Sequence, residues 1–124
     1  MDGKTKGGRR LLFIFGFVFL GVRRIKHGLV FDDELEFLSV RLGDGWKRLA
    51  RRLGFTVDKI EAIDKDNVRL SVKAYKMLMI WRQREGSHAT YQVLHDALVN
   101  KLVKRRDLAE VFCIDDGRPF LVST

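Results

Sequence analysis

Apolar residues recur at the spacing of an α-helix from residue 32 onward, and this periodicity most limits what the chain can fold into. The first segment places Leu35, Leu38 and Leu42 at i, i+3 and i+7, positions that share one face of a helix. The single proline is Pro119, so nothing in the periodic region carries the residue that breaks helices. No segment shows the apolar–polar alternation of a half-buried strand. The sequence therefore predicts an all-α fold.

Turn-forming residues divide this region into six periodic segments, each short enough to be one helix of a small bundle. Gly43-Asp44-Gly45 ends the first segment, and Gly54 supplies a stop after the second. Thr56 can cap the third, because a threonine oxygen accepts a hydrogen bond from the first turn. The expected helical segments are about 32–42, 46–53, 57–65, 68–85, 90–102 and 108–112.

We expect the apolar positions of the six segments to meet in one core. Val57 in the third segment, Leu102 at the end of the fifth and Val111 in the sixth are expected to face it as well. Both tryptophans lie on apolar stripes, which favours a role in the core over a role as binding hot spots. The residues predicted for the core are Leu38, Leu42, Trp46, Leu49, Leu53, Ile60, Ile63, Leu78, Trp81, Leu94, Leu98 and Leu108.

The positive charge is concentrated at the N-terminus. Of the formal net charge of +8, residues 1–30 carry +6 and residues 31–124 only +2. The basic balance therefore says little about nucleic-acid binding by the folded part. Residues 11–22 form an unbroken apolar run between pairs of arginines. As a helix this run would reach about 18 Å, short of a bilayer core of about 30 Å.

Three interpretations of the apolar run remain open. It is the end of a longer membrane segment, an anchor that lies on a membrane surface, or upstream sequence that does not pack on the domain. We expect residues 1–30 to be a basic and apolar leader that the domain does not need for folding. The predicted domain covers residues 31–113, and residues 114–124 are expected to form a tail.

Two clusters of basic residues lie in or beside the predicted helices. In the second segment they occupy the positions between the apolar ones and so form its outer face. The other cluster follows the fifth segment and has no interleaved aromatic residues to stack on bases, which favours an acidic protein partner over nucleic acid. The first cluster is Lys47, Arg48, Arg51 and Arg52, and the second is Lys101, Lys104, Arg105 and Arg106.

Catalysis and metal binding have little support in the sequence. Cys113 is the only cysteine, so no disulfide forms within the chain, and no signature of a nucleophilic site surrounds it. His27, His88 and His95 lack the spacing of zinc ligands on one helix. Gly43-Asp44-Gly45 follows no strand and lacks the remainder of a phosphate-binding loop. We expect neither a cofactor nor a metal.

Several segments in their order along the chain resemble the death-domain family. These are GDGWKRLARRLGF, VDKIEAI, YKMLMIWRQREG, HATYQVLHDAL and RRDLAEVF, over about residues 32–113. A tryptophan opens the second helix and another closes the fourth, and the block WKRLARRL is similar to the second helix of the Fas-associated adaptors of this family. The resemblance implies a six-helix antiparallel Greek-key bundle.

The resemblance also implies a function. Members of the family are non-enzymatic modules that bind other death domains, in signalling platforms for apoptosis or inflammation. They do so through helices one and four against two and three, the end of helix four against helix six, and helix three against nearby loops. The positions here that the resemblance and the charge clusters assign to partner binding are Lys47, Arg48, Arg51, Arg52, Asp58, Glu61, Lys104, Arg105 and Arg106.

Three hypotheses follow for the protein as a whole. It is a cytoplasmic adaptor or scaffold that assembles with other death domains and in some conditions with itself. Alternatively it is the cytoplasmic end of a membrane receptor, since Arg23, Arg24 and Lys26 after the apolar run agree with the positive-inside rule. The third and least favoured hypothesis is a basic helical module that binds nucleic acid.

Overall fold

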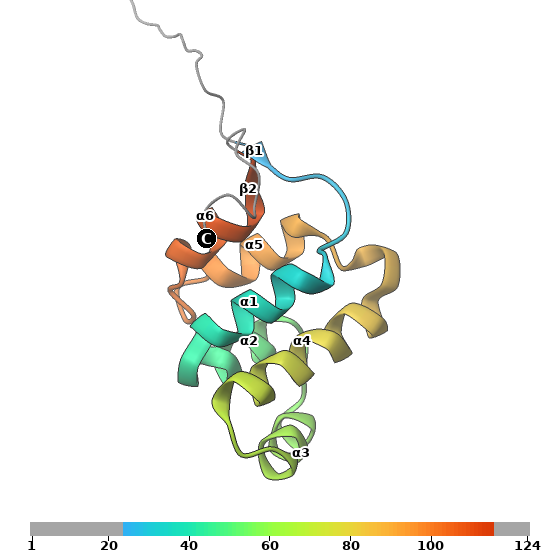
Figure 1. Ribbon diagram of the computed structural model, residues 1–124, viewed down its shortest axis with the longest axis vertical. Coiled ribbons are helices and arrows are strands. Elements are labelled where there is room, and N and C mark those ends of the chain that lie inside the picture. The colour runs from blue at the N-terminus through green and yellow to red at the C-terminus, as the bar shows by residue number, and fades with distance from the viewer. Residues whose placement is uncertain (1–23, 116–124) are drawn as a thin grey trace, which may run out of the picture. The chain divides into compact units, whose positions relative to one another are not determined.

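The computed structural model describes residues 24–115, and the six predicted helical segments are α-helices within that range (Figure 1). An all-α fold is thereby confirmed. The helices are α1 Asp32–Leu42, α2 Trp46–Arg52, α3 Val57–Asp66, α4 Leu70–Glu85, α5 Tyr91–Val99 and α6 Arg106–Cys113. Two 3₁₀ turns, η2 Gly43–Gly45 and η3 Gly86–His88, and two short strands, β1 Arg24–Ile25 and β2 Ile114–Asp115, complete the list of elements.

The helices belong to one compact unit, Ile25–Cys113. A smaller unit contains, among the described residues, Arg24 and Ile114–Asp115, which belong to a two-stranded sheet of β1 and β2. The sequence did not predict these strands, because two residues are too few to show alternation. In the helical unit α4 packs against α1, α2 and α3, and α5 packs against α6 and α2.

Predicted turn residues do begin and end the helices. The Thr56 hydroxyl oxygen accepts a hydrogen bond from the Lys59 amide at 3.2 Å and so caps α3. Thr90 does the same for α5. Gly54 follows α2 with a φ of +94°, a left-handed conformation that glycine adopts at little cost. Local chemistry thus sets the end of α2 and the starts of α3 and α5.

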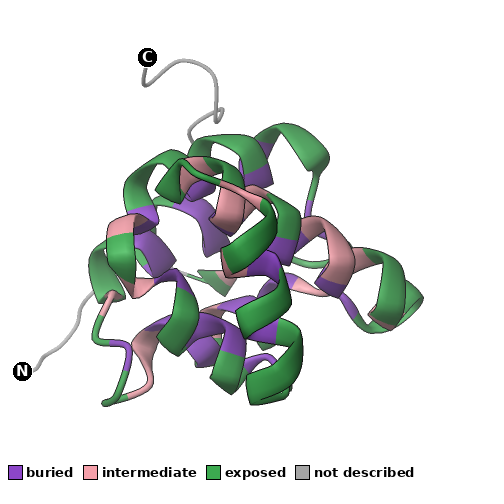
Figure 2. Cartoon of the chain, turned by 90° about the horizontal axis from the view of Figure 1, so that it is seen from below, coloured by how far each residue is buried: buried purple, intermediate pink, exposed green. Residues whose placement is uncertain are grey.

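The twelve residues predicted for the core, from Leu38 to Leu108, are all buried, and the buried positions lie on the inner sides of the helices (Figure 2). Trp46 and Trp81 are among the largest fully buried side chains. Trp46 opens α2 and Trp81 lies near the end of α4, and these two helices pack against each other. The apolar stripes therefore meet as the helical spacing requires.

Three further residues expected to face the core are exposed. Val57 is 49% exposed because it is the first residue of α3, ahead of the buried Ile60 and Ile63. Leu102 is 56% exposed because α5 ends at Val99, not at residue 102. Val111 is 47% exposed because it points away from the side of α6 that the structure buries. These three predictions are wrong, and two of the residues, Val57 and Leu102, line a surface groove.

The segment before α1 packs on the helices, and the compact helical unit begins at Ile25. The expected domain boundary at residue 31 stays a prediction. Val30 is buried, and its carbonyl oxygen accepts a hydrogen bond from the Nε of Arg82 at 2.6 Å. Residues this far apart in the sequence give no local signal of their contact. Residues 1–23 and 116–124 lie outside the described residues. The structure therefore tests none of the three interpretations of the apolar run 11–22. None of the helices in residues 24–115 has the length and apolar character needed to cross a bilayer.

A buried carboxylate holds this segment against two helices. Glu34 of α1 pairs with the ammonium of Lys26 at 2.8 Å and accepts a hydrogen bond from the hydroxyl of Tyr91 on α5. It also accepts one from the Phe31 amide at 3.3 Å. Burial and then the neighbouring carboxylate raise the pKa of the Tyr91 hydroxyl. We call Lys26, Glu34 and Tyr91 the Glu34 cluster.

Candidate protein-interaction surface

The outer face of α2 carries four basic residues. Trp46, Leu49 and Ala50 turn inward and are buried, so the intervening positions of this short helix face solvent. The exposed basic residues are Lys47, Arg48, Arg51 and Arg52. The helical spacing that buries the apolar side therefore also gathers the charge on the other side.

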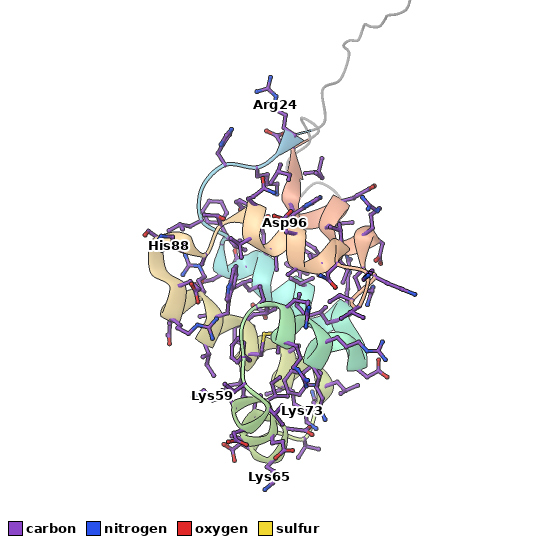
Figure 3. All side chains as sticks on the ribbon, turned by 180° about the vertical axis from the view of Figure 1, so that it is seen from behind. Arg24, Lys59, Lys65, Lys73, His88 and Asp96 are labelled. Carbon is purple, nitrogen blue, oxygen red and sulfur yellow. The ribbon has the colours of Figure 1, made fainter. Side chains whose placement is uncertain are left out.

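One of these four residues is tethered by a carboxylate. The ammonium of Lys47 lies 2.9 Å from Oδ2 of Asp64 on α3, while Lys73 of α4 contacts Oδ1 of the same residue at 2.5 Å. Lys73 is seen beside α3 in Figure 3. The hydrogen bond from Lys73, and then that from Lys47, hold the pKa of the Asp64 carboxyl below its usual value of 3.8. The charge of Lys47 is thus already partly compensated.

The three arginines of α2 differ from Lys47 because their charges are not paired with a described residue. The side chains of Arg48, Arg51 and Arg52 have no hydrogen bond or ion pair with any residue that the structure describes. A guanidinium can bind a carboxylate with two parallel hydrogen bonds, and here that capacity is unused. These arginines are therefore available to an acidic partner.

Beside α2 lies a groove of about 600 Å³, which we call the basic groove. It is bordered by α2, the start of α3 and the loop between α5 and α6, so residues about 50 positions apart meet in it. Its lining combines basic side chains with apolar ones. The lining residues are Lys47, Arg48, Arg51, Arg52, Val57, Ile60, Glu61, Lys101, Leu102 and Lys104.

The loop between α5 and α6 is held in one conformation by its own backbone. The Asn100 carbonyl oxygen accepts hydrogen bonds from the amides of Val103 at 2.9 Å and Lys104 at 2.8 Å. The Asn100 side chain accepts a third from the Leu102 amide at 2.9 Å. Val103 is consequently buried, while Leu102 and Lys104 are exposed at the groove. Lys104 has a φ of +58°, which an L-residue adopts only at a cost.

The structure brings together most of the residues that the sequence assigned to partner binding, but not all. Six of them line the basic groove, from Lys47 to Lys104, and three do not. Asp58 is exposed on α3 outside the groove lining, and Arg106 is exposed at the start of α6. The six that line it are Lys47, Arg48, Arg51, Arg52, Glu61 and Lys104. Their role in binding stays a prediction.

Arg105 is occupied within the domain. Its guanidinium contacts both carboxylate oxygens of Asp107 at 3.1 Å and donates to the Leu42 carbonyl oxygen at 3.4 Å. The hydrogen bond from Arg105 lowers the pKa of the Asp107 carboxyl. Arg105 therefore joins the start of α6 to the end of α1, and it does not line the basic groove. Its role in partner binding stays a prediction.

Sequence reasoning missed the apolar part of the groove. Val57 and Leu102 were expected in the core and instead line the groove beside the buried Ile60. Lys101 belonged to the predicted basic cluster but not to the predicted binding residues. Leu102 is a single leucine within the basic segment from Lys101 to Arg106, but its spacing also fits the apolar stripe of the fifth helix, so nothing in the sequence clearly indicated its exposure.

The groups considered for catalysis lie elsewhere. Cys113 is buried at the end of α6, and burial raises the pKa of its thiol to about 12, so the reactive thiolate is disfavoured at neutral pH. Nδ1 of His95 lies 3.4 Å from the Asp96 carboxylate. Within residues 24–115 no three histidine, cysteine or carboxylate side chains gather as a metal site would require.

Comparison with known proteins identifies the fold family. The family model of the death domain matches residues 32–112. Human receptor-interacting serine/threonine-protein kinase 1 is 46% identical over 57 residues, which cover 44% of this chain and 8% of that protein. Human THO complex subunit 1 is 34% identical over 95 residues, 77% of this chain and 14% of that protein.

A receptor is similar as well. Mouse tumor necrosis factor receptor superfamily member 10B is 36% identical over 94 residues, 69% of this chain and 24% of that protein. The chain thus spans at most about a quarter of the length of these three relatives. The likeness of α2 to the Fas-associated adaptors remains a prediction. The order of the six helices and the family match together show that this chain belongs to the death-domain family, whose domains are protein-interaction modules.

Proposed function

We propose that this chain is a non-enzymatic adaptor or scaffold that binds other death domains in apoptotic or inflammatory receptor signalling. The observation that carries the proposal is the outer face of α2, where three arginines have no partner among the described residues. Names of the relatives support the setting, since one is a receptor-interacting kinase and another a receptor. The proposed location is the cytoplasm.

The proposed partner presents an acidic surface, such as the acidic side of another death domain. Unpaired charges raise the rate of encounter with an oppositely charged surface and exclude partners of like charge. Arg48 and Arg51 lie at i and i+3 and so share one side of α2. They are the residues that a partner would meet together.

The test is reversal of both charges, Arg48→Glu with Arg51→Glu. The probes are the regions of the kinase and receptor relatives that match this chain, each mixed with it and followed by light scattering at low and physiological salt. We expect assembly to be lost, at a cost of several kcal/mol (roughly 2–5), because like charges now meet. Unfolding free energy should change by under about 0.5 kcal/mol, as both residues are exposed.

A matched control reverses two exposed basic residues that lie outside the groove and outside the predicted binding set, Lys65→Glu with Lys76→Glu. The net charge changes equally, so unchanged assembly in this control assigns the effect to the position of the charges. If the folded Arg48 and Arg51 double variant assembles as before, α2 does not bind partners. If the control variant loses assembly to the same extent, assembly depends on the net charge and not on the position of the charges.

A second candidate is the cytoplasmic domain of a membrane receptor. The receptor relative favours it, as does a rat protein named death domain-containing membrane protein NRADD, 39% identical over 85 residues. The two candidates are separated by fractionation of cells that express the full chain. Recovery with membranes that resists high salt and alkaline carbonate supports the receptor, and recovery in the soluble fraction supports the adaptor.

A further inference from the structure

We propose that the basic groove binds one acidic helix of a partner, and that an apolar side chain of this helix fills the space between Val57 and Leu102. The inference rests on the proposed function and adds the chemistry of the partner segment. It also adds the loop between α5 and α6 to the residues that determine which partner is accepted.

Charge is the first argument. Six of the groove's side chains are basic and only Glu61 is acidic. Lys47 is paired with Asp64, but neither the three arginines nor Lys101 and Lys104 form an ion pair with a described residue. Their mutual repulsion is uncompensated in the free domain, and an acidic segment in the groove would relieve it.

The apolar residues in the lining of the groove are the second argument. Val57 and Leu102 expose about half of their surface, and the buried Ile60 lies with them in the lining. Apolar side chains surrounded by a polar rim are typical of the centre of a protein interface, where most of the binding energy arises. A polyphosphate or nucleic-acid backbone would leave these side chains uncovered, and no aromatic residue of the lining could stack on a base.

Dimensions favour a single helix. A volume of about 600 Å³ accommodates a few side chains, not a folded domain. Positions i, i+3, i+4 and i+7 of a helix form one side, so carboxylates and one apolar residue can face the groove together. The carboxylates would meet α2 and Lys101 or Lys104 on either side of the central apolar contact.

The loop presents its side chains without needing to rearrange. Three hydrogen bonds to Asn100 hold the turn, and Lys104 keeps a left-handed conformation that only the surrounding structure can maintain. A surface already held in its binding conformation loses less entropy when the partner arrives. Leu102 and Lys104 are therefore the residues through which the loop selects a partner.

The experiment uses a synthetic helical peptide with glutamates at i, i+3 and i+7 and leucine at i+4. Its affinity for the full chain is measured by fluorescence anisotropy at physiological salt. Leu102→Ser should weaken binding about tenfold or more, because the partner leucine loses its apolar contact. Replacing the peptide leucine by alanine should weaken it similarly, and combining the two changes should add little.

Matched variants separate the loop from the rest of the surface. Val111→Ser changes an equally exposed valine outside the groove and should leave the affinity unaltered. Lys104→Glu should weaken binding and reduce its dependence on salt, whereas Lys65→Glu outside the groove should do neither. Circular dichroism of each variant verifies the fold.

Four results would overturn the proposal. If neither Leu102→Ser nor loss of the peptide leucine changes the affinity, binding is purely electrostatic. If inorganic polyphosphate binds with equal affinity, the groove is a polyanion site. A chain that Leu102→Ser converts from oligomer to monomer would assign the groove to a second copy. No detectable binding of the peptide by the wild-type chain would leave the groove without the proposed occupant. In all four cases the double reversal at Arg48 and Arg51 still tests the proposed function separately.

Discussion

The Glu34 cluster and the basic groove both contain charged side chains, but those of the cluster are paired within the domain and most of those in the groove are not. In the cluster a buried carboxylate bonds to an ammonium, a hydroxyl and a backbone amide, and the contacts join residues as far apart as Glu34 and Tyr91. In the groove most of the cations have no partner among the described residues. Charges that stabilise the fold are satisfied within it, and charges available for binding are not.

The largest expected effect comes from removing the segment before α1, which supplies Lys26 to the cluster. Deleting residues 1–30 removes Lys26 and the buried Val30, which should lower the unfolding free energy by about 4 kcal/mol. Deletion of residues 1–23 keeps both contacts and serves as the control. Urea denaturation followed by tryptophan fluorescence compares the two chains. Equal midpoints would show that the domain does begin near residue 31, as the sequence suggested.

Next in size is the carboxylate itself. Glu34→Ala should cost about 3 kcal/mol, because Lys26 loses its carboxylate and the Tyr91 hydroxyl and Phe31 amide lose their acceptor in a buried place. Glu34→Gln keeps the shape and an acceptor oxygen and should cost less. The comparison would fail if thermal unfolding of Glu34→Ala matched that of an exposed control such as Glu36→Ala.

A smaller effect, of opposite sign, is expected in the groove. Lys104→Gly removes the strain of the left-handed residue and should stabilise the domain by about 0.5 kcal/mol. The same change removes a cation and loosens the loop, so binding of the acidic peptide should weaken. The unfolding free energy would then rise while the affinity for the peptide falls. We expect no variant of the Glu34 cluster to combine these two effects. A loss of stability would mean that the Lys104 side chain supports the loop.

The smallest effect concerns Asp64, the half-buried carboxylate that tethers Lys47. Its folded-state pKa is lowered, mainly by Lys73, so its contribution to stability is present above the usual value of 3.8 and is lost as pH falls through the folded value. The stability difference between wild type and Asp64→Asn should therefore be constant from about pH 7 to pH 5 and shrink below about pH 4. Denaturant titrations at each pH measure it. A difference that grew on acidification would contradict the assigned pairing.

The helices, their caps and the buried tryptophans could be predicted because each depends on neighbours within one or two turns. Thr56 and Thr90 cap through residues three positions away, and Trp46 and Leu49 share a side of α2 by spacing alone. The cationic part of the groove on α2 was predictable for the same reason: positions that are not buried in a short amphipathic helix must face water.

Only the tertiary structure decided which charges remain available and where the apolar contact lies. Lys104 and Arg105 are neighbouring basic residues that the sequence does not distinguish. In the structure Arg105 bonds to Asp107 and to the Leu42 carbonyl oxygen, whereas Lys104 lines the groove. Leu102 fits a helical stripe until Asn100 ends the helix before it. Val30 contacts Arg82, and Lys26 and Tyr91 both contact Glu34. Such contacts join segments distant in the chain, and local spacing carries no information about which distant groups will meet.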